Sequence, residues 1–145
     1  MIYTSNFSTW GLHKLPKGAR AISIAGRAPD WYTGEQYKVL APKYWFFKKY
    51  KEDADSDYYT LMYNAEVLGG LNVRKIIGTL CNLVGYGRYY PNIHRDKDRH
   101  IVLLCYEKPD DFCHRHLVAE WMNEMGFECK EYEVGLNEYG INPNE

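Results

Sequence analysis

The most reactive side chains of the sequence gather where an apolar run gives way to a helical pattern. Cys113, His114 and Arg115 supply a thiol, an imidazole and a guanidinium in succession. They follow the apolar run 100–107, which ends in Glu107, and a Lys-Pro-Asp-Asp break. A first helical turn presents free backbone N–H groups and the positive end of the helix dipole, which favour an anion. The spacing predicts an anion site at a helix start, beside groups for proton transfer and nucleophilic attack.

Each of these groups has a catalytic interpretation and a packing interpretation. Cys113 is a candidate nucleophile, because a helix dipole and a neighbouring cation favour a thiolate. His114 and Glu107 are candidate general acids or bases. In the packing interpretation, Cys113 lies on the buried stripe of its helix, and Arg115 pairs with Asp110 or Asp111 of the preceding turn.

A metal site is an alternative use of the same thiols. Four side chains with zinc-ligand chemistry are Cys105, Cys113, His94 and His100. Their spacing does not match a zinc motif. His114 and His116 are two positions apart, so on a helix they point to different faces and do not bind one metal together. We therefore predict neither a metal nor a cofactor.

The elements that must position these groups follow from apolar periodicity. Apolar runs predict strands at 1–6, 20–25 and 100–107, and alternation at 127–134 predicts an edge strand. Helices are expected over 33–51 with a break at Pro42, over 56–67, over 73–83, and from Asp110 or Asp111 to Gly126. This order predicts one three-layer, Rossmann-like α/β domain over 1–134, with a loose tail over 135–145. Its central sheet is expected to be mostly parallel, with helices on both faces.

Ligands of such sheets bind beyond the carboxyl ends of the strands. Three strand ends are expected to meet there, carrying Ser5 and Asn6, Arg27, and Glu107. Arg27 and Arg115 would then bind a phosphate or carboxylate through their paired N–H groups. The sequence predicts that these residues line one ligand-binding crevice.

The segment 84–99 contains flexible glycines and is predicted to be a long exposed loop. Tyr86 and Tyr89 are candidates for stacking on a base, and Arg88 is a candidate for contacting a phosphate. Such loops serve as lids or binding segments, and equally as solvated connections. Both interpretations stay open at this point.

Composition limits the possible partners. The chain has 145 residues, 14 tyrosines and a formal charge of −1, which gives no general attraction to nucleic acid. The basic, aromatic run 44–51 is either a nucleic-acid patch or an amphipathic helix that buries Trp45 and Phe46. Four cysteines without a C-x-x-C pair, no signal peptide and no membrane-spanning apolar run predict a reduced cytoplasmic protein without membrane contact.

Two short motifs carry a family resemblance. Leu-Leu-Cys-Tyr-Glu at 103–107, followed by Cys-His-Arg at 113–115, resembles the signature of the domain of unknown function 488 family. Looser correspondences are Thr4, Arg27 with Pro29, and Leu68-Gly69-Gly70. Ala25-Gly26 stands where members of that family usually carry an acidic residue before the arginine. The resemblance implies a fold and a site at the Cys-His-Arg turn, but no reaction.

Three functional hypotheses follow. The first is an enzyme, a hydrolase or transferase, that acts on a nucleotide, nucleoside or nucleic-acid base at a glycosidic or phosphate bond. The second is a non-catalytic protein that binds a small phosphorylated or nucleotide ligand in the same crevice. The third is a nucleic-acid-binding protein, which requires the 44–51 and 88–99 segments to form one basic face.

Overall fold

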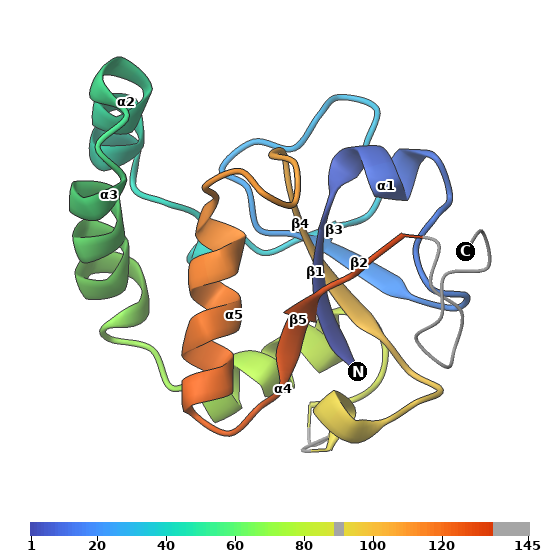
Figure 1. The fold of residues 1–145 in the computed structure, drawn as a ribbon. Helices are drawn as coiled ribbons and strands as arrows, with labels where there is room; N and C mark the ends of the chain where they lie inside the picture. Colours follow the sequence, from blue (N-terminus) through green and yellow to red (C-terminus); the bar gives the residue numbers. More distant parts are fainter. Residues whose placement is uncertain (89–91, 135–145) are drawn as a thin grey trace.

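A computed structural model describes residues 1–88 and 92–134 of the chain. A five-stranded sheet with the order β3-β2-β4-β1-β5 forms its centre, and all paired strands are parallel (Figure 1). The strands are β1 (Ile2–Asn6), β2 (Arg20–Ser23), β3 (Glu35–Gln36), β4 (Ile101–Cys105) and β5 (Cys129–Glu131). The prediction of an α/β fold with a parallel central sheet is confirmed.

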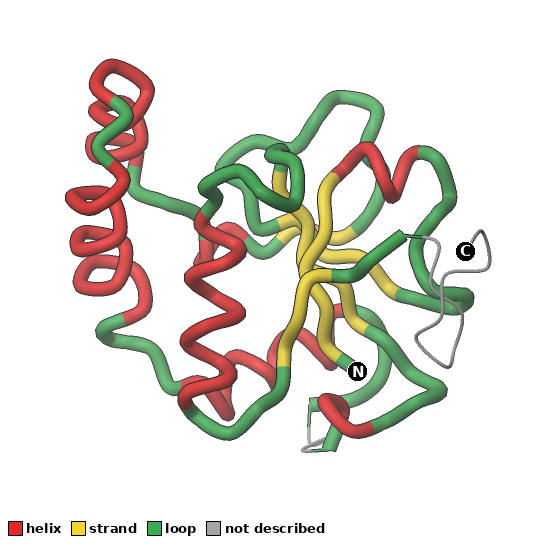
Figure 2. Tube along the Cα trace, viewed as in Figure 1, coloured by secondary structure: helices red, strands yellow, loops and turns green. Residues whose placement is uncertain are grey.

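Helices surround this sheet (Figure 2). The α-helices are α1 (Phe7–Gly11), α2 (Tyr44–Asp53), α3 (Ser56–Tyr63), α4 (Val73–Leu83) and α5 (His114–Glu124). A π-helical turn, Asn64–Leu68, continues α3, and 3-10 turns occur at Lys38–Leu40 and Ile93–Arg95. No helix within the described ranges is both long and apolar enough to cross a membrane.

The two faces of the sheet have separate cores, because successive side chains of a strand point to opposite faces. Ile22 and Leu103 belong to the larger core, to which α2, α3, α4 and α5 contribute buried side chains. Val102 and Leu104 belong to a smaller core beneath α1. Figure 1 shows α1 and α5 on opposite sides of the sheet, with α2 and α3 extending the α5 layer to one side. β4 is buried along its whole length, as its continuous apolar run predicted.

The start of α5 differs from the prediction. The break after β4 closes as a turn in which the Asp111 N–H donates to the Lys108 carbonyl at 3.1 Å. Asp110 and Asp111 are therefore part of this turn and do not cap the helix. The N-cap is Cys113, with extended backbone angles (φ −157°, ψ 144°), so the helix begins at His114.

The segments before α1 and α2 also differ from the prediction. Asn6 caps α1 by accepting a hydrogen bond from the Thr9 N–H, and this short helix was not predicted from the sequence. The helix expected over 33–51 is wrong before Pro42, because Glu35–Gln36 pairs with β2 as an edge strand. After Pro42, where the break was expected, the chain forms α2. β5 lies at the other edge of the sheet, where the alternating 127–134 pattern placed a strand.

Candidate active site

A cavity of about 580 Å³ lies beyond the carboxyl ends of β2 and β4. Its aromatic walls are Tyr44, Phe47, Tyr50, Tyr59, Tyr106 and Phe112. Its remaining lining residues are Ala25, Gly26, Arg27, Pro42, Lys51, Cys105, Glu107, Cys113 and His114. This is the sheet edge at which the sequence placed the ligand crevice.

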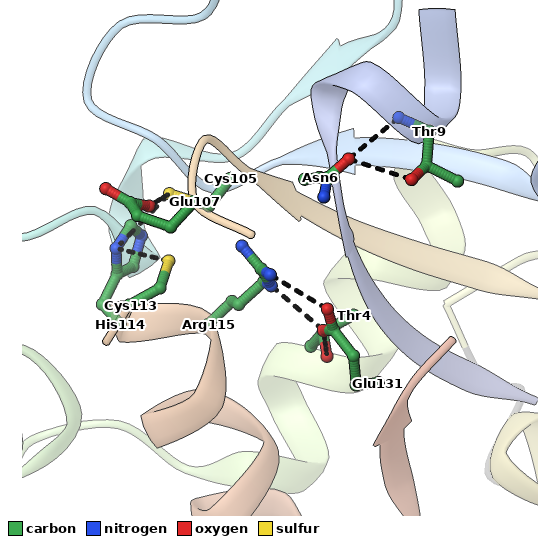
Figure 3. Close-up of polar contacts among 9 residues, drawn as sticks. All are labelled: Thr4, Asn6, Thr9, Cys105, Glu107, Cys113, His114, Arg115 and Glu131. Atoms are coloured by element: carbon green, nitrogen blue, oxygen red, sulfur yellow. Dashed lines mark hydrogen bonds and ion pairs between the residues drawn. The ribbon is translucent and has the colours of Figure 1, made fainter. Parts of the chain in front are cut away.

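Two thiols and an imidazole meet in this cavity (Figure 3). His114 Nδ1 lies 3.7 Å from Cys105 Sγ and 4.0 Å from Cys113 Sγ. One donor atom from each of the three residues falls within 4.8 Å of the other two. The strand–turn–helix unit explains this meeting, because Cys105 ends β4 and Cys113 caps α5. We call these three residues the Cys-Cys-His cluster.

A hydrogen bond on the side of the ring away from the thiols fixes the orientation of His114. Nε2 lies 2.8 Å from the carbonyl oxygen of Ile24, which follows β2. A carbonyl only accepts hydrogen bonds, so Nε2 carries the proton and Nδ1 faces the two sulfurs. The buried ring of Tyr63 packs against the imidazole, with centroids 5.6 Å apart. His114 therefore presents Nδ1 to the thiols in a defined position.

The pKa values of the two thiols in the cluster are shifted in opposite directions. A hydrogen bond from the Cys105 thiol, helped by His114, holds the pKa of Cys113 well below its ordinary value despite burial. The same hydrogen bond, together with burial, raises the pKa of Cys105. Cys113 is therefore the more acidic thiol of the pair.

Glu107 adjoins the cluster from the side of Cys105. Its Oε2 lies 3.5 Å from Cys105 Sγ, and the side chain is half-buried in the cavity wall. Burial, and then the negative charge of Cys113, raise the pKa of this carboxyl. The structure thus brings together the three predicted catalytic residues Cys113, His114 and Glu107.

The prediction that Arg27 and Arg115 together bind one phosphate or carboxylate is wrong. Arg115 is fully buried and donates from Nε and Nη2 to the two carboxylate oxygens of Glu131, at 3.0 and 2.9 Å. Thr4 Oγ1 donates to the same carboxylate at 2.7 Å. Arg115 points away from the Cys-Cys-His cluster (Figure 3), whereas the exposed Arg27 lines the cavity and pairs with Asp30 at 3.6 Å. The packing interpretation holds for Arg115, with Glu131 as its partner in place of Asp110 or Asp111.

Ser5 and Asn6 do not line the cavity either. The Asn6 side chain accepts hydrogen bonds from the backbone N–H and the hydroxyl of Thr9, at 2.8 and 2.9 Å. Ser5 is buried within β1, opposite Leu104 in register. The end of β1 runs directly into α1, so its polar groups serve that junction.

Tyr86 lies at the opposite end of the sheet. Its hydroxyl donates to the His100 carbonyl at 3.4 Å, and its ring lies 4.9 Å from the Arg20 guanidinium. His100 and Arg20 stand at the amino ends of β4 and β2, because the 84–99 segment must lead into β4. The exposed Arg88 belongs to the same segment and is not part of the cavity, so the predicted binding roles of Tyr86 and Arg88 there are wrong. Tyr89 and the predicted tail 135–145 lie outside the described residues.

The structure brings together two of the four side chains that were considered as zinc ligands from sequence. Cys105 and Cys113 come together, but His100 precedes β4 and so lies about 16 Å along the strand from Cys105. His94 packs against Phe127 in a 3-10 turn before the same strand. The imidazole of the cluster is His114.

The aromatic walls of the cavity were not identified from sequence. The 44–51 run forms α2, which buries Phe46 and leaves Trp45 51% exposed, so the amphipathic interpretation holds for Phe46 only. Tyr50 and Lys51 of α2 and Tyr59 of α3 line the cavity. The basic, aromatic composition of this run was the available signal. It did not indicate that α2 would lie across the cavity from the end of β4.

The chain matches no protein-family model, no curated protein and no solved structure. The resemblance to the domain of unknown function 488 family therefore stays a prediction.

Proposed function

We propose that the protein is an enzyme that acts on a nucleotide, nucleoside or nucleic-acid base. The observation that carries this proposal is the position of the Cys-Cys-His cluster and Glu107 in the wall of an aromatic cavity of about 580 Å³. Small-molecule sites typically enclose roughly 300–1,000 Å³, with apolar walls and a few convergent polar groups. Reactive groups in such a cavity favour catalysis over a purely structural role.

The composition of the walls supports a planar heterocycle as substrate. Tyr50, Tyr59 and Phe112 offer aromatic faces and edges on which a base or sugar can pack. Arg27 and Lys51 are exposed cations of the same cavity, placed to contact a phosphate. The walls thus accept a nucleoside, and the two cations extend this recognition to a nucleotide.

Hydrolysis or group transfer is the chemistry that the reactive groups favour. Glu107 is a carboxyl group beside the cluster and is suited to moving a proton to or from a leaving group. The Cys-Cys-His cluster is the reacting centre, either through the Cys113 thiolate or through a group that the cluster holds.

Turnover of a panel of nucleotides, nucleosides and short oligonucleotides tests the proposal. We expect turnover by the wild type and a loss of about 10²-fold or more in kcat for Glu107→Gln. The matched control is Glu128→Gln, because Glu128 is an exposed glutamate outside the cavity. Equal turnover by all three proteins, or turnover by none, would contradict the proposal.

Binding without catalysis is the second candidate, favoured by walls and cations that are complete without the thiols. It predicts thermal stabilisation by the ligand that is preserved in Glu107→Gln, and recovery of the ligand chemically unchanged. Conversion of the ligand by the wild type would support the enzyme and contradict binding without catalysis.

A further inference from the structure

We infer that Cys105, Cys113 and His114 bind a zinc ion, and that zinc-bound water attacks the substrate. The site stands on its own geometry, whereas the reaction assigned to it rests on the proposed function. Zinc also accounts for two sulfurs and one ring nitrogen converging in a wall of the ligand cavity.

The donor distances are close to those of a tetrahedral zinc site. Zinc lies about 2.3 Å from a cysteine sulfur and about 2.1 Å from a histidine nitrogen, so a bound sulfur and nitrogen stand about 3.6 Å apart. The His114 Nδ1 atom lies 3.7 Å from Cys105 Sγ and 4.0 Å from Cys113 Sγ. Movements of a few tenths of an ångström bring each sulfur to this distance from Nδ1. The two sulfurs lie within 4.8 Å of each other and must approach to about 3.8 Å to share one tetrahedral zinc ion.

The hydrogen bond from His114 Nε2 to the Ile24 carbonyl is of the kind that orients metal-bound histidines. Metal-bound imidazoles donate their second ring N–H to a carbonyl or carboxylate, which fixes the tautomer and the ring. His114 makes this bond from Nε2 to the Ile24 carbonyl at 2.8 Å and thereby leaves the Nδ1 lone pair toward the thiols. The ligand is therefore preorganised.

The ligand set selects zinc and leaves one coordination position open. Two thiolates and an imidazole suit this borderline-soft ion, whereas magnesium and calcium prefer oxygen ligands. Catalytic zinc sites have three protein ligands and a water in the fourth position. All three residues of the cluster line the cavity, so the fourth position faces the substrate.

Glu107 completes a hydrolytic centre from outside the coordination sphere. Its Oε2 lies 3.5 Å from Cys105 Sγ, whereas the three mutually close donor atoms come from Cys105, Cys113 and His114. Zinc held by two cysteines and a histidine, with a glutamate that is not a ligand, is the arrangement that deaminates nucleobases. The substrate class is therefore an amino-substituted base, as nucleoside, nucleotide or single-stranded nucleic acid.

The reaction balances with water as the only co-reactant. The zinc-bound water gives one proton to Glu107, and its oxygen bonds to the ring carbon that bears the amine. Glu107 passes this proton to the adjacent ring nitrogen. The C–N bond then breaks as the amine takes the hydroxyl proton, leaving ammonia and a ring carbonyl.

Metal content and a cobalt spectrum of the full chain test the site. We expect one zinc per chain, and cobalt substitution that gives intense visible bands with thiolate charge transfer, the signature of tetrahedral sulfur ligation. Cys105→Ser, Cys113→Ser and His114→Ala should lose both readouts. Cys81→Ser and Cys129→Ser are matched controls that should keep them, because these buried cysteines lie outside the cluster.

Ammonia release from amino-substituted nucleosides and nucleotides tests the reaction. Glu107→Gln should keep the zinc and lose turnover. A reduced wild type that takes up no zinc, or zinc retained by all three cluster variants, overturns the site. Zinc binding without ammonia release overturns the reaction and upholds the site. Turnover of a nucleotide without zinc upholds the proposed function and overturns this inference.

Discussion

At the residue scale, Cys113 and Arg115 stand two positions apart and serve opposite parts of the molecule. Cys113 is the extended N-cap of α5, and Arg115 lies in the first turn of the helix. Cys113 joins the cavity, whereas Arg115 is directed to Glu131 of β5. The sequence predicted both in one anion site, because both were expected in the first helical turn. Cys113 instead precedes the helix, so the divergence of the two side chains depends on where α5 begins.

The buried ion pair gives a prediction about stability. Glu131→Gln removes the charge that compensates the fully buried Arg115, and we expect it to lower the free energy of unfolding by about 3 kcal/mol. Urea unfolding measures this change. Glu128→Gln is the control, because its contact with Lys130 spans 4.0 Å on the surface and should contribute nothing measurable. Similar losses in both variants would contradict the structural importance of the buried pair.

The exposed cations give a prediction about ligand selection. Arg27→Ala and Lys51→Ala should each weaken nucleotide binding about tenfold, the effect of losing one charged contact of roughly 1.4 kcal/mol. Nucleoside binding should change little, because the aromatic walls stay intact. Calorimetric titration of matched nucleoside and nucleotide separates the two effects, with the exposed α2 residue Lys48, outside the cavity lining, changed to alanine as control. Equal weakening of both ligands would place the cations away from the phosphate.

At the element scale, the strand–turn–helix unit was predictable and its exact start was not. The apolar run gave β4 correctly, since a strand buried on both faces needs no alternation. The N-cap was assigned by residue preference to Asp110 or Asp111, but the turn that closes at Asp111 delays the helix to His114. The ligand-binding role predicted for the 84–99 segment was wrong, although the direction of the chain determines at which end of the sheet this segment lies. A segment that leads into a parallel strand lies at the amino end, away from the ligand edge.

Helix α4 gives a prediction that runs against helix propensity. A Cβ at Gly78 would stand 2.7 Å from the Arg88 carbonyl oxygen, which belongs to the backbone. Alanine favours a helix over glycine by about 1 kcal/mol, but we expect Gly78→Ala to destabilise by about 1–3 kcal/mol because of this overlap. Thermal unfolding measures the sign. Gly70→Ala is the control, with nothing within 4 Å of its added Cβ, and stabilisation by Gly78→Ala would contradict the close approach.

Strand β5 gives a prediction about pH. Burial raises the pKa of Cys129 from 9.0 to about 12, so the folded protein keeps this proton after the unfolded chain has lost it. The stability that the thiol contributes is complete below pH 9.0 and is lost as the pH rises toward about 12. The slope of the wild type should exceed that of Cys129→Ala by up to about 1.4 kcal/mol per pH unit. Urea unfolding over a pH series measures the difference, and parallel profiles would contradict it.

At the scale of the whole molecule, the cavity depends on contacts that no local pattern encodes. The strand order β3-β2-β4-β1-β5 brings Ile24 after β2 beside His114 of α5, ninety positions later. The α2–α3 pair then supplies aromatic walls against β4 from yet another part of the chain. Periodicity predicts the elements and the edge of the sheet that binds ligands. The orientation of the His114 ring and the aromatic walls follow only from how those elements are arranged in space.

The inferred zinc ion links that arrangement to global stability. Its ligands come from the end of β4 and the start of α5, which are joined through a turn and are held together only in the folded protein. An ion that binds only the folded state stabilises it by about 2.7 kcal/mol when its free concentration is 100 times the dissociation constant. We therefore expect a strong chelator to lower the unfolding temperature by roughly 5–10 °C, and added zinc to restore it. Cys113→Ser should unfold at the same temperature with chelator and with zinc, whereas Cys81→Ser should respond like the wild type. A chelator response that survives in Cys113→Ser would place the metal elsewhere, because that variant lacks one of the three ligands on which the effect depends.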